Sequence, residues 1–85
     1  MYKIDWKTKA VKQLDKISDR DTRKEIRNEV SNLSDWPNVQ HVKKLANHKY
    51  DYRLRVGRFR VFFDISDTVR IIHIEEVKKR DDRAY

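Results

Sequence analysis

Arginine side chains are concentrated in one short stretch of this chain. Residues 52–63 have the sequence YRLRVGRFRVFF, in which Arg53, Arg55, Arg58 and Arg60 occur with no acidic residue between them. Guanidinium groups bind phosphate through paired hydrogen bonds, and they stabilise negative charge that develops in a transition state. Their pKa lies above ~12, so they are poor general bases. The stretch therefore predicts anion binding and charge stabilisation.

The same stretch predicts two strands that meet at a turn containing Gly57. Side chains alternate across a strand with period two, so the apolar residues can all face a core while the strand arginines occupy the opposite face. The apolar set consists of Leu54, Val56, Phe59, Val61 and Phe63. The sequence thus predicts a basic surface directly behind a hydrophobic one.

Length and composition narrow the class of protein. The chain has 85 residues, a net charge of +7 and no cysteine. We expect a single domain over residues 1–85, without disulfides or a thiolate metal site. The charge favours an anionic partner, although a solvated basic surface has the same composition. No apolar run approaches the ~20 residues of a membrane span and the N-terminus lacks a signal-peptide core, so we expect a cytoplasmic protein with no membrane partner.

Apolar periodicity predicts the elements that position the arginines. Amphipathic helices are expected over residues 8–17 and about 20–33, with Asp5 or Thr8 capping the first and the polar break at 18–21 capping the second. Strands are expected at residues 2–6, 42–46, 50–56, 59–66 and 69–77.

The element order predicts an α+β fold. It consists of an N-terminal strand, a two-helix hairpin and then a three- or four-stranded antiparallel meander. The first strand must join the sheet because alone it cannot bury Ile4, and both helices then pack on one sheet face. The last strand has apolar residues on both faces, so we expect it to be central. Ile72 and Ile74 share one face, and Ile71, His73 and Val77 share the other.

Other candidate chemistry is weaker. The three histidines lack metal-ligand spacing, and a single glycine excludes a glycine-rich phosphate loop, so we expect no metal and no cofactor. His73 is expected to be a packed, hydrogen-bonded histidine. We interpret the adjacent Glu75 and Glu76 as structural partners of arginine rather than as an acid/base pair, because neighbours on a strand face opposite ways.

Two sequence motifs resemble the RelE/ParE superfamily of bacterial toxins. Residues 52–61, YRLRVGRFRV, are similar to its central signature YRLRVGxYRV, and residues 77–85, VKKRDDRAY, are similar to its C-terminal KR…Y signature. Chain length and predicted element order also match. The resemblance implies a toxin of a type II toxin–antitoxin pair, whose partner is a small cognate antitoxin. We expect the free toxin to be a monomer.

The resemblance also implies roles for individual residues. The RelE branch cleaves mRNA in the ribosomal A site, whereas the ParE branch inhibits DNA gyrase. In the RelE pattern, Arg60 would bind the scissile phosphate, Arg80 would act on the leaving oxygen, and Tyr85 would stack on the base. Arg53 and Arg55 stand where some RelE proteins have lysines, and would stabilise charge on the phosphorane.

We therefore expect a ribosome-dependent mRNA endoribonuclease that uses 2′-OH attack without a metal. The products would be a 2′,3′-cyclic phosphate and a 5′-OH. The general base is unassigned, because Lys78 or Lys79 fits this role only if surrounding positive charge depresses its pKa. Alternatives are a ParE-like gyrase inhibitor and an inert toxin homologue that binds an antitoxin. The residues expected to contact RNA around the catalytic group are Arg58, Lys78, Lys79 and Arg83.

Overall fold

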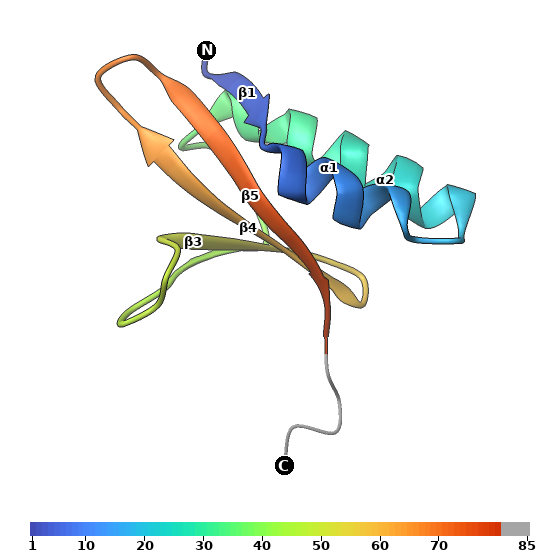
Figure 1. Cartoon of the computed structure of the whole chain (residues 1–85). Helices are drawn as coiled ribbons and strands as arrows, with labels where there is room; N and C mark the ends of the chain where they lie inside the picture. Colours follow the sequence, from blue (N-terminus) through green and yellow to red (C-terminus); the bar gives the residue numbers. More distant parts are fainter. Residues whose placement is uncertain (81–85) are drawn as a thin grey trace.

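The computed structural model describes residues 1–80, which form a five-stranded sheet with helices on one face (Figure 1). The elements are β1 (Lys3–Trp6), α1 (Thr8–Asp15), α2 (Arg20–Ser31), the 3-10 helix η1 (Asn32–Asp35), β2 (Val42–Lys44), β3 (Tyr52–Val56), β4 (Phe59–Ser66) and β5 (Ile71–Lys79). The strand order is β1-β5-β4-β3-β2, with β1 parallel to β5 and the other neighbours antiparallel. The predicted α+β fold is confirmed, and the meander has four strands. None of these helices is long and apolar enough to span a bilayer.

The helical hairpin supplies one half of the core. α1 packs against β5, and α2 packs against β3 (Figure 1). The Oε1 atom of Gln13 on α1 accepts a hydrogen bond from the N–H of Val77 at 2.7 Å, which satisfies a backbone donor of β5 beyond the end of β1. The buried core is formed by Ala10, Leu14, Ile26, Val30, Leu33, Leu54, Val56, Val61, Phe63, Ile72, Ile74 and Val77.

The predicted cap of the first helix is wrong. Lys7 occupies the N-cap position and makes no side-chain cap hydrogen bond, while Thr8 is the first helical residue. Asp5 is engaged elsewhere, because its Oδ2 lies 3.0 Å from Lys7 Nζ and 3.0 Å from His73 Nδ1. His73 Nε2 in turn lies 3.1 Å from Ser66 Oγ, so the prediction of a packed, hydrogen-bonded histidine is confirmed.

The second helix begins at Arg20, as predicted, but the α-helix ends at Ser31, two residues before the predicted end, and continues as η1. Asp19 is its N-cap and accepts hydrogen bonds from the Asp21 N–H at 3.2 Å and the Thr22 hydroxyl at 2.6 Å. The Thr22 hydrogen bond lowers the pKa of the Asp19 carboxyl. After η1, the Trp36 ring packs edge-on against Tyr52 with centroids 4.9 Å apart. This contact fixes the chain that leaves the helices against the sheet.

The last strand begins two residues later than predicted. Val69 is 62% exposed and precedes the strand. Arg70 has a left-handed φ of 55°, and its N–H donates to the Asp67 carbonyl at 3.3 Å. The turn therefore extends through Arg70 before extended geometry resumes at Ile71.

A β-bulge in β5 changes which side chains face the core. Residues 62–63 of β4 are consecutive, but they pair with Glu76 and Ile74 respectively, so Glu75 is the extra residue. The bulge inverts the alternation, and Val77 joins Ile74 in the core. The prediction that Val77 lies on the opposite face is therefore wrong, because it assumed an unbroken period of two.

The bulge also places Glu76 in a buried polar cluster. Its carboxylate accepts hydrogen bonds from the Tyr50 hydroxyl at 2.7 Å and Gln13 Nε2 at 3.3 Å, and it lies 3.4 Å from Lys9 Nζ and 3.7 Å from Lys78 Nζ. Burial alone would raise the pKa of the Glu76 carboxyl, but the hydrogen bonds from Tyr50 and Gln13 and the charge of Lys78 outweigh it and hold that pKa at about 2. The predicted arginine partnership is wrong for Glu76, which pairs with lysines.

Replacing Glu76 tests this cluster. Glu76→Gln keeps the side-chain shape but removes the buried acceptor charge, so we expect a loss of ~2–3 kcal/mol in the free energy of unfolding at pH 7. The folded-state pKa of about 2 lies below the ordinary value of 4.5. The contribution is therefore complete above about pH 4.5 and is lost as the pH falls through about 2. Urea unfolding of both proteins between pH 7 and pH 2 measures it.

Glu75→Gln is the matched control, because it removes the neighbouring carboxylate at the bulge and leaves the four Glu76 contacts in place. We expect it to change the free energy of unfolding by less than ~0.5 kcal/mol. Equal effects of the two substitutions would contradict the assignment of the stability to Glu76.

Candidate functional site

The arginines of the central hairpin lie on the sheet face opposite the helices. In the β3–β4 pairing Arg55 stands opposite Arg60, while Leu54 pairs with Val61 on the core side. The pleat therefore separates basic from apolar side chains, as the alternation of the sequence predicts.

The hairpin turn positions the residue that follows β5. Gly57 has a left-handed φ of 56°, and a Cβ there would meet only Glu25 Oε1 at an ordinary 3.7 Å, so backbone conformation is what requires glycine. The backbone N–H of Arg80 donates to the Arg58 carbonyl of this turn at 2.7 Å. The hydrogen bond ties the end of β5 to the hairpin and brings Arg80 beside the strand arginines.

A hollow of about 100 Å³ forms where these elements meet, and four of the five predicted catalytic residues line it. Its lining residues are Arg53, Arg55, Gly57, Arg58, Phe59, Arg60 and Arg80. No carboxylate of the described residues is among them. The fifth, Tyr85, lies outside the described residues, as does Arg83, which was predicted to contact RNA.

Arg53 shows the electrostatic cost of this arrangement. Its Nε is buried and has no hydrogen-bond partner within residues 1–80. Burial lowers the pKa of the Arg53 guanidinium, and the charges of Arg60, Arg55 and Arg80 lower it further. A cation whose pKa is lowered by folding is held at a cost to stability. A bound anion would offset that cost, so the hollow is built for negative charge.

The two lysines of the C-terminal strand lie on opposite faces. Lys78 pairs with Arg60 in the β4–β5 ladder, and its Nζ lies 3.7 Å from the Glu76 carboxylate. Lys79 instead lines a separate hollow on the helix side, together with Asp19. Of the two, Lys78 belongs to the arginine face.

A second hollow of about 360 Å³ adjoins the first. Arg55, Gly57 and Arg80 line both hollows. The second also contains three side chains that sequence reasoning did not assign to the site, namely Glu25, Glu29 and His41. Spacing gives a signal for the glutamates, because residues four apart share one helix face. His41 lies in an aperiodic loop and has no comparable signal.

No arrangement suited to a metal ion is found in the described part of the chain. Within residues 1–80, no three His, Asp or Glu side chains come together as a metal-binding group. The ionisable side chains that line the two hollows are guanidinium groups, one imidazole and two carboxylates.

Removing the most crowded charge should stabilise the free protein. For Arg53→Gln we expect the melting temperature at low ionic strength to rise by about 2–5 °C, because the substitution removes a partly buried cation beside three others. Added inorganic sulfate should raise the melting temperature of the unaltered protein more than that of the variant. Thermal unfolding with and without sulfate measures both effects.

Arg27→Gln serves as the charge-matched control, because it removes an exposed arginine of α2 that lines neither hollow. A lower melting temperature for Arg53→Gln than for this control would show that the Arg53 charge stabilises the fold, contrary to our expectation.

Comparison with known proteins gives one family and several similar folds. The family model described as the ParE toxin of type II toxin–antitoxin system, parDE, matches residues 4–83. The isolated RelE toxin of E. coli superposes with a TM-score of 0.81 at 16% identity, covering 99% of this chain and 89% of that chain. The RelE–RelB complex of Pyrococcus horikoshii gives 0.79 at 25% identity over 98% of each chain, and the RelBE2 toxin–antitoxin complex of Mycobacterium tuberculosis gives 0.78 at 22% identity over 93% and 98%. No curated protein matches the sequence.

Proposed function

Since this chain belongs to the ParE toxin family of type II toxin–antitoxin systems and has a RelE-like fold, we propose that it is a ribosome-dependent mRNA endoribonuclease. The observation that supports this activity is the convergence of Arg53, Arg55, Arg60 and Arg80 on one small hollow that no described carboxylate lines. Guanidinium groups that converge on a space of this size suit one phosphate group.

In this proposal each arginine has its own task. Arg60 binds the non-bridging oxygens of the scissile phosphate, and Arg53 and Arg55 stabilise the charge that grows on them as the ribose 2′-oxygen attacks. Arg80, tied to the hairpin turn, neutralises the leaving 5′-oxygen. The P–O5′ bond breaks, and the products are a 2′,3′-cyclic phosphate and a 5′-OH.

The small size of the hollow supports dependence on the ribosome. At about 100 Å³ it accommodates a phosphate group but offers little surface to hold a length of RNA. An mRNA in the ribosomal A site is already held in one orientation, so it would lose little further orientational entropy when the toxin binds. The positive face, including Lys78 and Arg58, would then make contact with the RNA and ribosomal phosphates.

A cognate antitoxin completes the proposed system. The similar structures from P. horikoshii and M. tuberculosis are toxin–antitoxin complexes. This chain has a net charge of +7, and its arginine face is exposed at Arg55 and Arg58. We expect an acidic antitoxin segment to cover that face in the cytoplasm, and the toxin without it to be a monomer.

A second candidate function is inhibition of DNA gyrase. The name of the matching family model favours it, because the ParE branch acts on gyrase. In that case the arginines would bind a protein partner, and their convergence on a phosphate-sized space would have no catalytic use.

Single arginine substitutions test the nuclease. In a translating extract we expect the unaltered toxin to cut mRNA inside translated codons, and Arg60→Ala and Arg80→Ala each to reduce the rate by about 10²–10³-fold through lost charge stabilisation. Mapping the new 5′ ends measures cleavage. Arg27→Ala, which removes an equal charge from the exposed face of α2, should cut at the normal rate.

A gyrase supercoiling assay with the same proteins separates the alternatives. Intact mRNA together with inhibited supercoiling would establish the gyrase function. Absence of both activities would leave an inert homologue that binds an antitoxin.

A further inference from the structure

The arginine hollow leaves one requirement of cleavage unmet. Attack by the ribose 2′-hydroxyl requires a group that takes its proton, and guanidinium, with a pKa above ~12, is unsuited to this at neutral pH. Lys78 is paired with the Glu76 carboxylate, and Lys79 lines a hollow on the helix side. Within residues 1–80, a base would then lie on another element that borders the arginines.

The adjoining hollow provides such an element. Because Arg55, Gly57 and Arg80 line both spaces, a nucleotide whose phosphate occupies the first can extend its ribose toward the second. The second hollow contains His41, whose imidazole is the side chain most often used as a general base at neutral pH.

His41 is held in register with the arginine strand. Its carbonyl accepts a hydrogen bond from the Arg55 N–H at 3.0 Å, immediately before β2 begins at Val42. Its backbone has a φ of 64°, a conformation that is uncommon for residues other than glycine. The hydrogen bond to β3 thus fixes a strained position and leaves the side chain exposed at the edge of the hollow.

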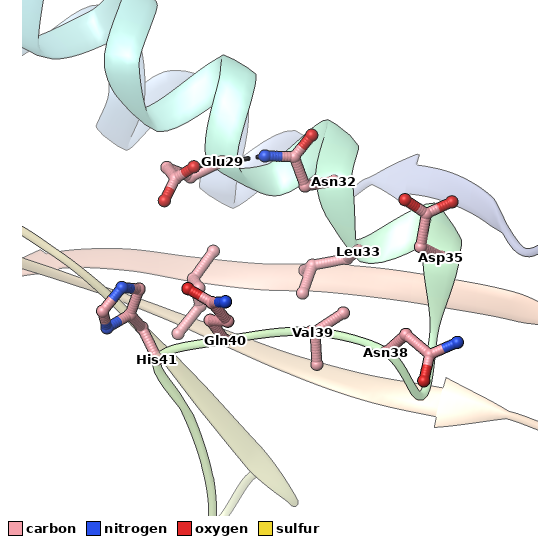
Figure 2. Close-up of a pocket in the computed structure, with 9 residues that line it drawn as sticks. Glu29, Asn32, Leu33, Asp35, Asn38, Val39, Gln40 and His41 are labelled. Carbon is pink, nitrogen blue, oxygen red and sulfur yellow. Dashed lines mark hydrogen bonds between the residues drawn. The ribbon is translucent and has the colours of Figure 1, made fainter.

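A carboxylate faces the imidazole from the neighbouring helix. Figure 2 shows the ring of His41 and the carboxylate of Glu29 directed toward each other between the loop and α2. Glu29 also accepts a hydrogen bond from Asn32 Nδ2 at 3.2 Å, which orients it. A carboxylate in this place would stabilise the imidazolium formed when histidine takes a proton.

The other charged groups around the imidazole are of both signs. They are Glu25 on α2, Asp35 on η1, Arg55 on β3 and Arg80 after β5.

We infer that His41 is the general base of the cleavage reaction, an inference that rests on the proposed nuclease function. A ring nitrogen of neutral His41 removes the proton from the 2′-hydroxyl as the 2′-oxygen bonds to phosphorus and the P–O5′ bond breaks. The departing 5′-oxygen takes a proton from water, and the imidazolium returns its proton to the solvent. No proton is consumed overall, and Glu29 acts as a positioning residue.

The left-handed backbone at residue 41 allows the imidazole to be removed without loss of stability. Because glycine adopts this conformation without strain, His41→Gly should fold at least as stably as the unaltered protein while removing the imidazole. We expect its cleavage rate on programmed ribosomes to fall by about 10²–10³-fold, with ribosome binding changed by less than about threefold. Imidazole added to the buffer should restore part of the rate.

The pH profile distinguishes proton transfer from a structural role. The rate of the unaltered toxin should rise with pH through the titration of an imidazole, and His41→Gly should lose that rise. Gln40→Ala is the matched control, because Gln40 occupies the same loop but lines the hollow of Figure 2 and not the one that contains Arg80. It should cut normally.

The remaining outcomes would contradict the role of His41, or the proposed function together with it. Normal cleavage by His41→Gly would overturn the inference and leave the proposed function intact. Lost ribosome binding, or a pH profile that the variant retains, would make His41 a binding or structural residue and also overturn it. Absence of cleavage by the unaltered toxin would overturn the proposed function and this inference together.

Discussion

Two like charges stand directly opposite each other beside the β3–β4 turn, and the rest of the molecule must hold them there. The Arg55–Arg60 pair belongs to the cross-strand class that weakens a sheet by ~0.2–1 kcal/mol. The opposite face of the same hairpin buries apolar side chains, each of which contributes ~1.5–3 kcal/mol. These are Leu54, Val56, Val61 and Phe63. The pleat thus lets one ladder bury a core on one face and present a positive surface on the other, while the helices cover the core.

The features that depend on local pattern could be predicted from the sequence. The alternation of apolar residues and arginines along residues 52–63 predicts both faces of the hairpin, and Gly57 predicts its turn. Asp19 caps the second helix because its carboxylate can accept hydrogen bonds from groups in the first turn, a role that its position in the polar break predicts. The grouping of Arg60 with Arg80 came from the family resemblance, since no periodicity relates a strand residue to one that follows another strand.

The features that depend on tertiary contacts could not be predicted in this way. A bulge in β5 left no signal, because the strand has apolar residues at both parities. Asp5 did not cap α1, because its carboxylate makes a hydrogen bond with His73, 68 residues away. Burial of Glu76 required partners on α1 and before β3, and the approach of His41 to the arginines required a loop conformation fixed by β3. In each case distant groups determined the outcome.

The bulge at Glu75 has a consequence for how chains of this kind are compared. Each strand residue advances the chain by ~3.3 Å, and successive side chains point to opposite faces of the sheet. The extra residue of the bulge therefore determines which face every later side chain of the strand points to. A chain with the same fold but a regular β5 would have to place its tail arginine one position nearer to the residue equivalent to Ile74. An alignment anchored on the arginine alone would then pair side chains that point to opposite faces. The distance in sequence from the last core isoleucine, taken together with the presence of the bulge, is the measure of whether another chain can assemble the same hollow.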